Sequence, residues 1–168
     1  PLLLSGDHSN AGGTLAGIRM AYPESRVGVI WIDAHADLHS PYTSPSGNLH
    51  GMPLAVALNE DNIEEKVNDL DYETIDLWEM LKNVGDICPK IEYRDLVYIT
   101  LRDFEEQETA LIKQNKVKVV TTNELRKTGI TKLSREILRY LSACDKIYIS
   151  FDVDSMDPMV SRGTGTPV

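Results

Sequence analysis

The sequence has little cysteine, a deficit of positive charge and no long hydrophobic run, and each shortage excludes a class of protein. Two cysteines in 168 residues, Cys88 and Cys144, cannot form a disulfide framework, and without a CxxC spacing they predict two reduced, buried thiols. There are 17 lysines and arginines against 26 aspartates and glutamates, a formal net charge of -9. Nucleic acids and anionic membranes need a basic surface on their partner, so neither is expected to bind.

The two ends of the chain carry little information on targeting. The opening run PLLL is too short for a membrane span or a signal peptide, which makes a cytoplasmic location the default expectation. The chain starts at Pro1 without a methionine and stops in the glycine-rich GTGTPV, which predicts a segment of a longer protein. A content of 42% hydrophobic and 26% charged residues is ordinary for one soluble domain, so we expect residues 1–168 to form a single domain.

Short apolar runs alternate with stretches of helical character. Strands are predicted for the runs at 1–6, 26–33, 95–103, 117–122 and 146–154, and helices for 10–21, 51 to about 81, 106–114 and 131–142. In the last helix Leu133, Ile137, Leu138 and Leu141 are predicted to form one apolar stripe. The acidic stretch 59–86 indicates a solvated surface helix or pair of helices. This alternation predicts an α/β fold, a parallel sheet with helices on both faces.

Acidic and histidine side chains follow three of the predicted strands directly. Because ligands of open α/β sheets bind outside the carboxyl ends of the strands, these groups should converge on one crevice. The groups are Asp7 and His8 after the first strand, Asp33, His35 and Asp37 after the second, and Asp152, Asp154 and Asp157 after the last.

The spacing of these groups predicts a site for metal ions. In an extended segment Asp33, His35 and Asp37 project to one side, and so do Asp152 and Asp154. Carboxylates sharing a cleft repel one another, and no lysine or arginine lies within either cluster to compensate. Asp33, Asp37, Asp152 and Asp154, together with two histidines, carry a formal charge that two divalent cations would balance. A ligand set of oxygen and imidazole favours Mn(II) over a thiolate-preferring metal.

Two other motifs fit less well. The segment DVDSMD, 152–157, has the acid spacing of an EF-hand loop but no glycine at the sixth position and no closing glutamate. ISFDVDSM, 149–156, is also similar to the nucleophile motif of haloacid-dehalogenase-type phosphatases, with Met156 where those have threonine or valine. Neither motif explains DAHAD at 33–37, so the two-metal interpretation is favoured.

Five segments, in order, resemble the motifs of the arginase/agmatinase ureohydrolase family, and within it the arginases. They are GDHS (6–9), DAHAD (33–37), SGNLHG (46–51), SFDVDSMDP (150–158) and TGTPV (164–168). The resemblance implies a three-layer α/β/α sandwich with a binuclear manganese centre, a catalytic domain incomplete at both ends in this chain, and a homo-oligomer, a trimer or hexamer. A family glutamate that binds the guanidinium is expected beyond Val168.

The resemblance also implies a role for individual residues. The ligands of one Mn(II) would be His8, Asp33, Asp37 and Asp152, and those of the other His35, Asp154 and the shared Asp33 and Asp152. Asp37 would also relay a proton, and His50 would act as a mobile proton shuttle. A small guanidino substrate would be bound by His39, Ser46 and Asn48 at its carboxylate, by Glu105 and Glu108 at its ammonium group, and by Thr166 at its guanidinium end. His39 stands where arginases commonly have asparagine.

The implied reaction is hydrolysis of L-arginine to L-ornithine and urea by hydroxide that two manganese ions generate from water. An agmatinase, a formimidoylglutamase or another ureohydrolase would share every metal ligand and stays a near alternative. From another class, a non-catalytic metal-binding fragment or paralogue is also compatible with the sequence.

Overall fold

The computed structural model describes residues 1–168, which divide into two compact units. Unit 1 comprises Pro1–Glu24 and Asp37–Lys90, and unit 2 comprises Ser25–Ala36 and Ile91–Val168. No helix in either unit has both the length and the apolar character needed to cross a bilayer.

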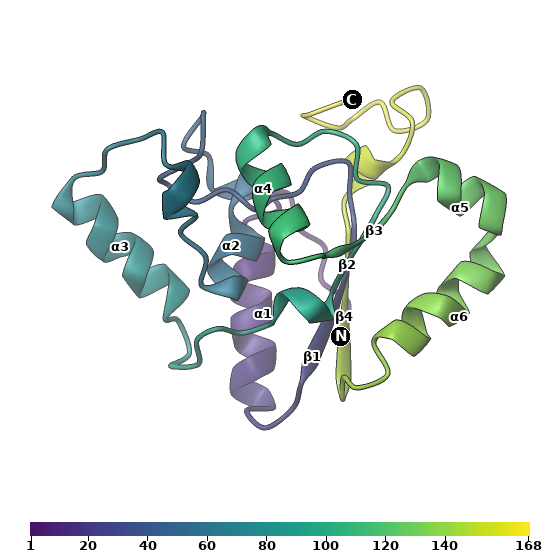
Figure 1. The fold of residues 1–168 in the computed structure, drawn as a ribbon, viewed down its shortest axis with the longest axis horizontal. Helices are drawn as coiled ribbons and strands as arrows, with labels where there is room; N and C mark the ends of the chain where they lie inside the picture. The colour runs from purple at the N-terminus through teal and green to yellow at the C-terminus, as the bar shows by residue number, and fades with distance from the viewer. The chain divides into compact units, whose positions relative to one another are not determined.

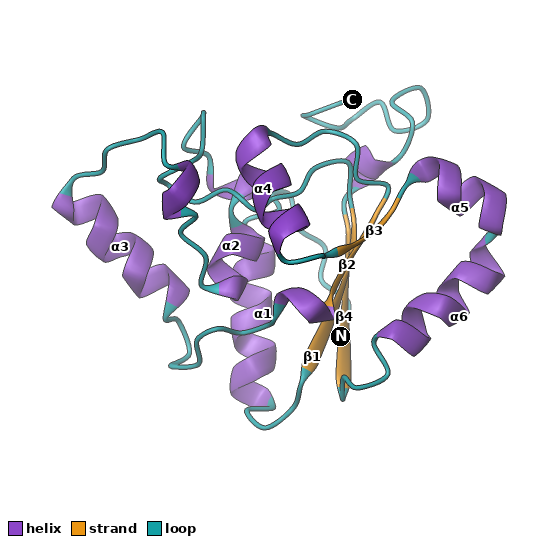
Figure 2. Ribbon diagram, in the orientation of Figure 1, coloured by secondary structure: helices purple, strands orange, loops and turns teal.

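Unit 2 is built on a four-stranded parallel sheet. The strands are β1 (Val27–Ile32), β2 (Leu96–Ile99), β3 (Lys118–Val120) and β4 (Lys146–Phe151), in the order β3-β2-β1-β4 (Figure 2). The register pairs Val29 with Leu96 and Val27 with Lys146. All carboxyl ends therefore meet at one edge of the sheet, and four of the five predicted strands are confirmed.

The helices of unit 2 cover both faces of this sheet. The chain moves outward from β2 to β3 through α4 (Glu106–Gln114) and returns to β4 through α5 (Thr122–Thr128) and α6 (Ile130–Tyr140). Because crossovers between parallel strands are right-handed, the two directions of travel place α4 on the face opposite to α5 and α6 (Figure 1). The predicted α/β class, with a parallel sheet between helices, is confirmed.

One side of the sheet packs against α6 through an apolar core. Ile30, Val97 and Val120 of the sheet contact Leu133 and Ile137 of the helix, together with Leu141. The predicted stripe is wrong at Leu138, whose residue surface is 53% exposed. Five residues after Leu133, it lies about 140° around the helix from it and so faces solvent.

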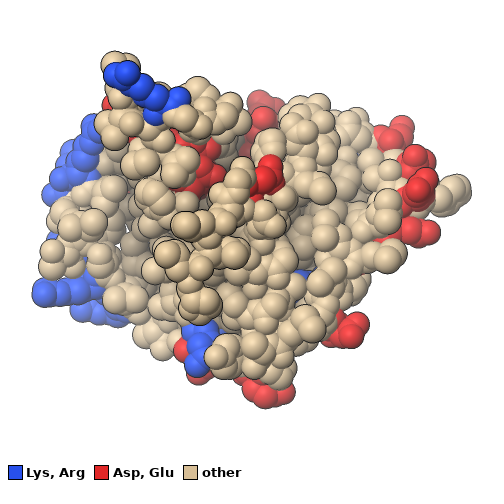
Figure 3. All heavy atoms as spheres, turned by 180° about the vertical axis from the view of Figure 1, so that it is seen from behind, with Lys and Arg blue, Asp and Glu red and all other residues tan.

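Helix α5 was not predicted, and the strand expected at 117–122 is shorter than expected. The strand ends at Val120, and the Thr121 hydroxyl then accepts a hydrogen bond from the Glu124 N–H at 3.1 Å. This N-cap starts a helix in a stretch with little apolar periodicity. Figure 3 shows basic side chains gathered over the α5–α6 region, so the acidic net charge is unevenly distributed.

Unit 1 contains helices and loops but no strand. Its helices are α1 (Asn10–Ala21), α2 (Pro53–Leu58) and α3 (Tyr72–Lys82). Helix α1 approaches α2 at Gly12, where an added Cβ would lie 3.6 Å from Val56 Cγ1. The expectation of helix from 51 to about 81 is wrong for 59–71, because α2 ends where Asn59 takes a left-handed φ of 58°.

Two further expectations for unit 1 are corrected. Residues 1–6 were predicted as a strand, but they pair with no strand of the sheet, and Leu2, Leu3 and Leu4 are exposed. A strand forms only where its backbone finds a partner, so an apolar sequence alone does not produce one. Both cysteines are unpaired as expected, but Cys88 is exposed and Cys144 is only partly buried.

A buried cation organises the polar interior of unit 1. The Lys82 side chain is 3% exposed, and its Nζ lies 2.6 Å from Asp61 Oδ1 and 2.7 Å from Glu79 Oε1. The indole N–H of Trp78 donates to the same Asp61 oxygen at 2.6 Å. Burial alone would lower the pKa of Lys82, but the two carboxylates outweigh it and raise the pKa.

Unit 2 instead buries an anion near the amino ends of its strands. The Asp95 carboxylate accepts two hydrogen bonds from the Arg26 guanidinium, at 2.8 Å from Nε and 2.7 Å from Nη2. The Cys144 thiol donates to Asp95 Oδ1 at 3.4 Å. Burial, together with the Asp95 charge, raises the pKa of this thiol to about 11.

Candidate metal centre

Two strand ends of unit 2 each place a buried carboxylate at the same edge of the sheet. Asp33 directly follows β1, and Asp154 lies in a short 3-10 turn, Val153–Ser155, after the neighbouring β4. Asp33 is 1% exposed and Asp154 is 3% exposed. The Ala34 N–H donates to Asp154 Oδ1 at 3.3 Å, which links the two strand ends directly.

The imidazole of His35 lies between these carboxylates. Its Nδ1 is 3.0 Å from Asp154 Oδ2 and 3.6 Å from Asp33 Oδ1. The hydrogen bond to Asp154 and the nearby Asp33 carboxylate outweigh burial and raise the pKa of His35 to about 10. A protonated imidazole at this position offsets the negative charge of the two buried acids.

These three side chains fit a metal ion by the chemistry of their donors. Asp33, His35 and Asp154 each offer one ligand atom, and these atoms all lie within 4.8 Å of one another. Carboxylate oxygen with imidazole nitrogen suits a divalent transition metal. A bound cation would take the place of the imidazole proton, because both neutralise the same carboxylates.

The structure does not bring the predicted ligand Asp152 into this group of three. Its Oδ1 accepts a hydrogen bond from the Asp154 N–H at 3.0 Å, so its side chain caps the turn that carries Asp154. The predicted substrate residue Thr166 does reach the group, because its hydroxyl lies 3.0 Å from Asp154 Oδ2.

Two residues that the sequence analysis did not select also contact the cluster. Asp103 Oδ2 lies 3.5 Å from His35 Nε2, and the two residues form an isolated parallel bridge. Thr100 has a left-handed backbone φ of 70°, and its hydroxyl lies 2.6 Å from the Ile99 carbonyl oxygen and 3.1 Å from that of Asp33. Asp103 lies four residues beyond the end of β2, so the rule of acids after strands, extended to LRD, would have identified it.

Unit 1 brings together two more of the predicted ligands. His8 Nδ1 lies 2.8 Å from Asp37 Oδ2, and both side chains are largely buried. The predicted alternation of Asp33, His35 and Asp37 along an extended segment is wrong at its end. β1 stops at Ile32, and Asp37 has a left-handed φ of 51°, a conformation that aspartate tolerates better than most residues.

The other predicted residues of unit 1 lie on a loop and short turn. His50 is half-exposed, with Nδ1 3.9 Å from Asp7 Oδ2. His39 is buried, and its Nδ1 is 3.0 Å from Thr43 Oγ1. Ser46 and Asn48 are exposed, and the Ser46 hydroxyl accepts the Asn48 N–H at 3.2 Å.

Glu105 and Glu108, predicted to bind substrate, form a capping box at the start of α4. The Glu105 side chain accepts from the backbone of Glu108, and Glu108 Oε2 accepts from the Glu105 N–H at 3.1 Å. Both carboxylates therefore have a structural use that the sequence analysis did not anticipate.

Fold and site together define an α/β protein with a candidate metal centre at the carboxyl edge of a parallel sheet. The model of the Arginase family matches residues 1–168, and the chain belongs to this family. The family that the sequence motifs predicted is thereby confirmed.

Individual relatives agree with this assignment. The chain is 45% identical over 168 residues to the arginase of Bacillus subtilis (strain 168), which covers 100% of this chain and 51% of the relative. It is 39% identical over 169 residues to arginase-1 of Homo sapiens, covering 99% of this chain and 48% of the relative. A crystal structure of arginase from Bacillus subtilis superimposes with a TM-score of 0.83, at 45% identity, covering 100% of this chain and 52% of that one. The chain thus spans about half the length of these relatives.

Proposed function

We propose that this chain is part of a manganese-dependent ureohydrolase that hydrolyses L-arginine to L-ornithine and urea. The observation that carries the proposal is the buried cluster of Asp33, His35 and Asp154 in unit 2. Family membership and 45% identity to an arginase favour this reaction over others. The cluster supplies what the reaction needs from the protein, a compact set of oxygen and nitrogen ligands.

The proposed ligands of two Mn(II) ions follow the family resemblance. They are His8, Asp33, His35, Asp37, Asp152 and Asp154. For Asp152 to bind, its carboxylate would keep one oxygen on the Asp154 N–H and use the other. Two such ions, when bound, lower the pKa of water and stabilise developing negative charge on a substrate.

Two residues of unit 1 are proposed to handle protons. Asp37, paired with His8 at 2.8 Å, offers a carboxylate that can accept a proton from a water molecule at the site. His50 is half-exposed and can exchange protons with solvent, which suits a shuttle to the leaving amine.

The proposed substrate contacts follow the family resemblance. His39, Ser46 and Asn48 would receive the substrate carboxylate, and Glu105 and Glu108 its ammonium group. Thr166 is supported further by its geometry, since its hydroxyl already lies 3.0 Å from Asp154. We also propose that the full-length protein forms a homo-oligomer.

A substrate panel on the full-length chain tests the reaction. With Mn(II) present, we expect urea and ornithine from arginine, and no turnover of agmatine or formimidoylglutamate. Turnover of one of those two instead would make the protein an agmatinase or a formimidoylglutamase. Stoichiometric manganese without turnover of any of the three would identify a non-catalytic metal-binding protein. Asp33→Ala, which removes a buried ligand, is the control and should lose both metal and activity.

A further inference from the structure

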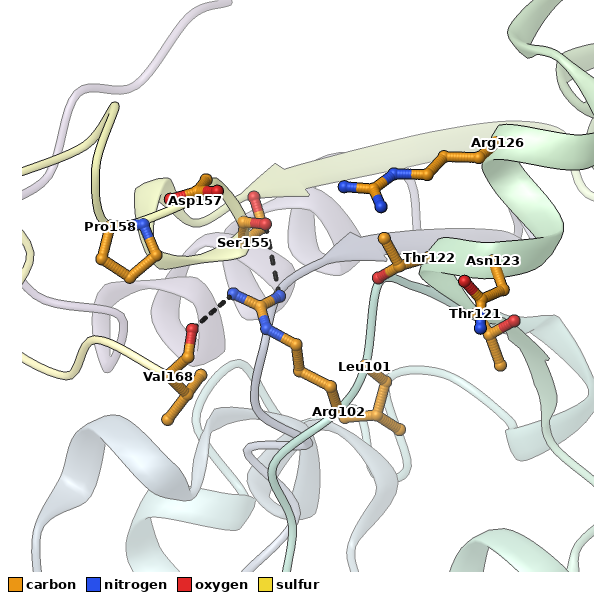
Figure 4. A pocket seen from close by; sticks show the side chains of 10 residues that line it. All are labelled: Leu101, Arg102, Thr121, Thr122, Asn123, Arg126, Ser155, Asp157, Pro158 and Val168. Atoms are coloured by element: carbon orange, nitrogen blue, oxygen red, sulfur yellow. Dashed lines mark hydrogen bonds between the residues drawn. The ribbon is translucent and has the colours of Figure 1, made fainter.

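Arg102 connects the ends of three strands in unit 2. It follows β2, and its backbone N–H donates to the Ala34 carbonyl, just after β1, at 2.9 Å. Its side chain crosses a cavity of about 570 Å³ toward the turn after β4, as Figure 4 shows. One residue therefore contacts the segments that carry both acids of the candidate metal centre.

The Arg102 guanidinium donates mainly to backbone carbonyls of that turn. Nη2 lies 2.7 Å from the Asp154 carbonyl oxygen, and Nη1 lies 3.2 Å from that of Ser155. The same guanidinium reaches the carbonyls of Thr100 and Val168, each at 3.3 Å. A planar fork of donors holds several acceptors at once, which a lysine ammonium on a flexible stem does not reproduce.

Asp154 is consequently fixed at both of its ends. Arg102 holds its backbone carbonyl, while Ala34, His35 and Thr166 contact its carboxylate. Holding the peptide plane after Asp154 restricts the backbone rotation that would carry the side chain away from His35. Partners that orient a metal ligand in this way set the affinity of a site as much as its ligands do.

We infer that Arg102 is a positioning residue of the candidate metal centre, which fixes the turn at 153–155 so that Asp154 points at His35. This inference rests on the proposed function for the presence of a metal. The guanidinium is exposed, so its contribution to global stability is expected to be small. Its effect should appear in metal affinity instead.

The experiment is a Mn(II) titration of the full-length chain, followed by the electron paramagnetic resonance signal of free Mn(II). Arg102→Met should raise the dissociation constant by about 10- to 100-fold, the usual effect of losing an orienting partner. Arg102→Lys should fall between this variant and the parent. Arg126→Met is the matched control, because Arg126 lines the same cavity from α5 (Figure 4), and it should bind like the parent.

Amide hydrogen exchange at 152–157, measured on the metal-free chains, is the second readout. Arg102→Met should exchange faster there than the parent, with an unchanged midpoint of denaturant unfolding. Equal manganese affinity and equal exchange in the two chains would overturn the inference. If the parent binds no manganese, the proposed function fails, and exchange alone decides: faster exchange in Arg102→Met supports an orienting role, and equal rates overturn it.

Discussion

The two units position their candidate ligands by different means. In unit 2, Asp33 and Asp154 follow adjacent parallel strands, so the register of β1 and β4 determines where both carboxylates lie. In unit 1, His8 and Asp37 lie on segments outside any strand, and Asp37 requires a left-handed backbone. A sheet specifies geometry through many backbone hydrogen bonds, whereas a loop depends on a few individual contacts. Strand ends are therefore the part of such a site that a sequence predicts best.

Each unit also contains a buried charge paired with partly exposed partners, and the two charges have opposite sign. Unit 1 buries the Lys82 ammonium against carboxylates that are partly exposed, whereas unit 2 buries the Asp95 carboxylate against the partly exposed guanidinium of Arg26. In each case, removing the partners of the buried charge leaves that charge uncompensated in the interior, which destabilises the fold.

The largest effect is expected from removing a proposed metal ligand of unit 2. Asp154→Asn keeps an oxygen that can accept the Ala34 N–H but loses the anionic charge. We expect Mn(II) affinity of the full-length chain to fall more than 100-fold, because the loss of an orienting partner already reduces affinity by about 10- to 100-fold. Isothermal titration calorimetry measures this change.

His50→Gln in unit 1 provides the contrast for that experiment. The His50 side chain is half-exposed and lies 3.9 Å from Asp7, so its loss should leave manganese uptake unchanged while lowering turnover. Equal loss of manganese in both variants would remove the distinction between the two units.

A second experiment compares two leucines of α6. Leu133 is buried against the sheet, and Leu133→Ala should lower the free energy of unfolding by about 2 to 5 kcal/mol through the cavity it leaves. Leu138 faces solvent, and Leu138→Ala should change it by less than about 0.5 kcal/mol. Denaturant unfolding of the full-length variants separates the two, and similar losses would contradict the assigned faces of the helix.

A third experiment compares the free energy of unfolding after substitution of the two buried charges, Asp95 and Lys82. Asp95→Asn should lower the free energy of unfolding by about 2 kcal/mol, since it weakens two charge-assisted hydrogen bonds in a buried place. Lys82→Met should lower it by about 1 kcal/mol, because Asp61 and Glu79 remain partly solvated.

The Lys82 effect also has a defined pH dependence. The pKa of Lys82 is raised in the folded protein, so its contribution is fully present below the ordinary lysine value of 10.5 and is lost as the pH rises through the higher folded value. The difference between Lys82→Met and the parent should therefore hold at pH 7 to 9 and shrink only above about pH 10.5. A difference that vanishes near neutral pH would contradict the ion pair.

The last prediction compares the alkylation rates of the two thiols, one in each unit, and has the smallest effect on the protein. Cys88 is exposed in unit 1 and should be alkylated rapidly. Cys144 in unit 2 has a pKa raised to about 11, which leaves roughly one thousandth of it as thiolate at pH 8. Its alkylation rate should rise about tenfold per pH unit toward pH 11, as mass spectrometry of each cysteine would show. Comparable rates for the two thiols at pH 8 would contradict their assigned environments.

Much of unit 2 follows from its sequence because apolar runs and parallel pairing act together. VGVIWI and KIYISF form β1 and β4, and the acids after them meet as expected. Unit 1 is harder to predict. Predicting a strand from an apolar run assumes that a neighbouring strand pairs with it, and the sequence does not show whether one does. LLL at 2–4 is as apolar as a strand yet pairs with none, and Asn59 ends a helix by its backbone conformation alone.

The same limit applies to single site residues. Glu105 and Glu108 are three residues apart at a helix start, which predicts a capping box as readily as a substrate contact, and only the structure shows the box. Arg102 carries no signal in a search for ligands, because it acts on backbone carbonyls.

Thr100 lowers the stability of the folded protein but helps to order the candidate site. A β-branched residue at φ 70° raises the energy of the native state by about 1 to 3 kcal/mol, while its hydroxyl holds the carbonyl of Asp33. A selection for heat resistance alone would favour glycine at this position, since glycine relieves the backbone. The same exchange would remove a hydroxyl within hydrogen-bond distance of the Asp33 carbonyl. Variants selected for heat resistance should therefore be more stable and bind the proposed metal less tightly.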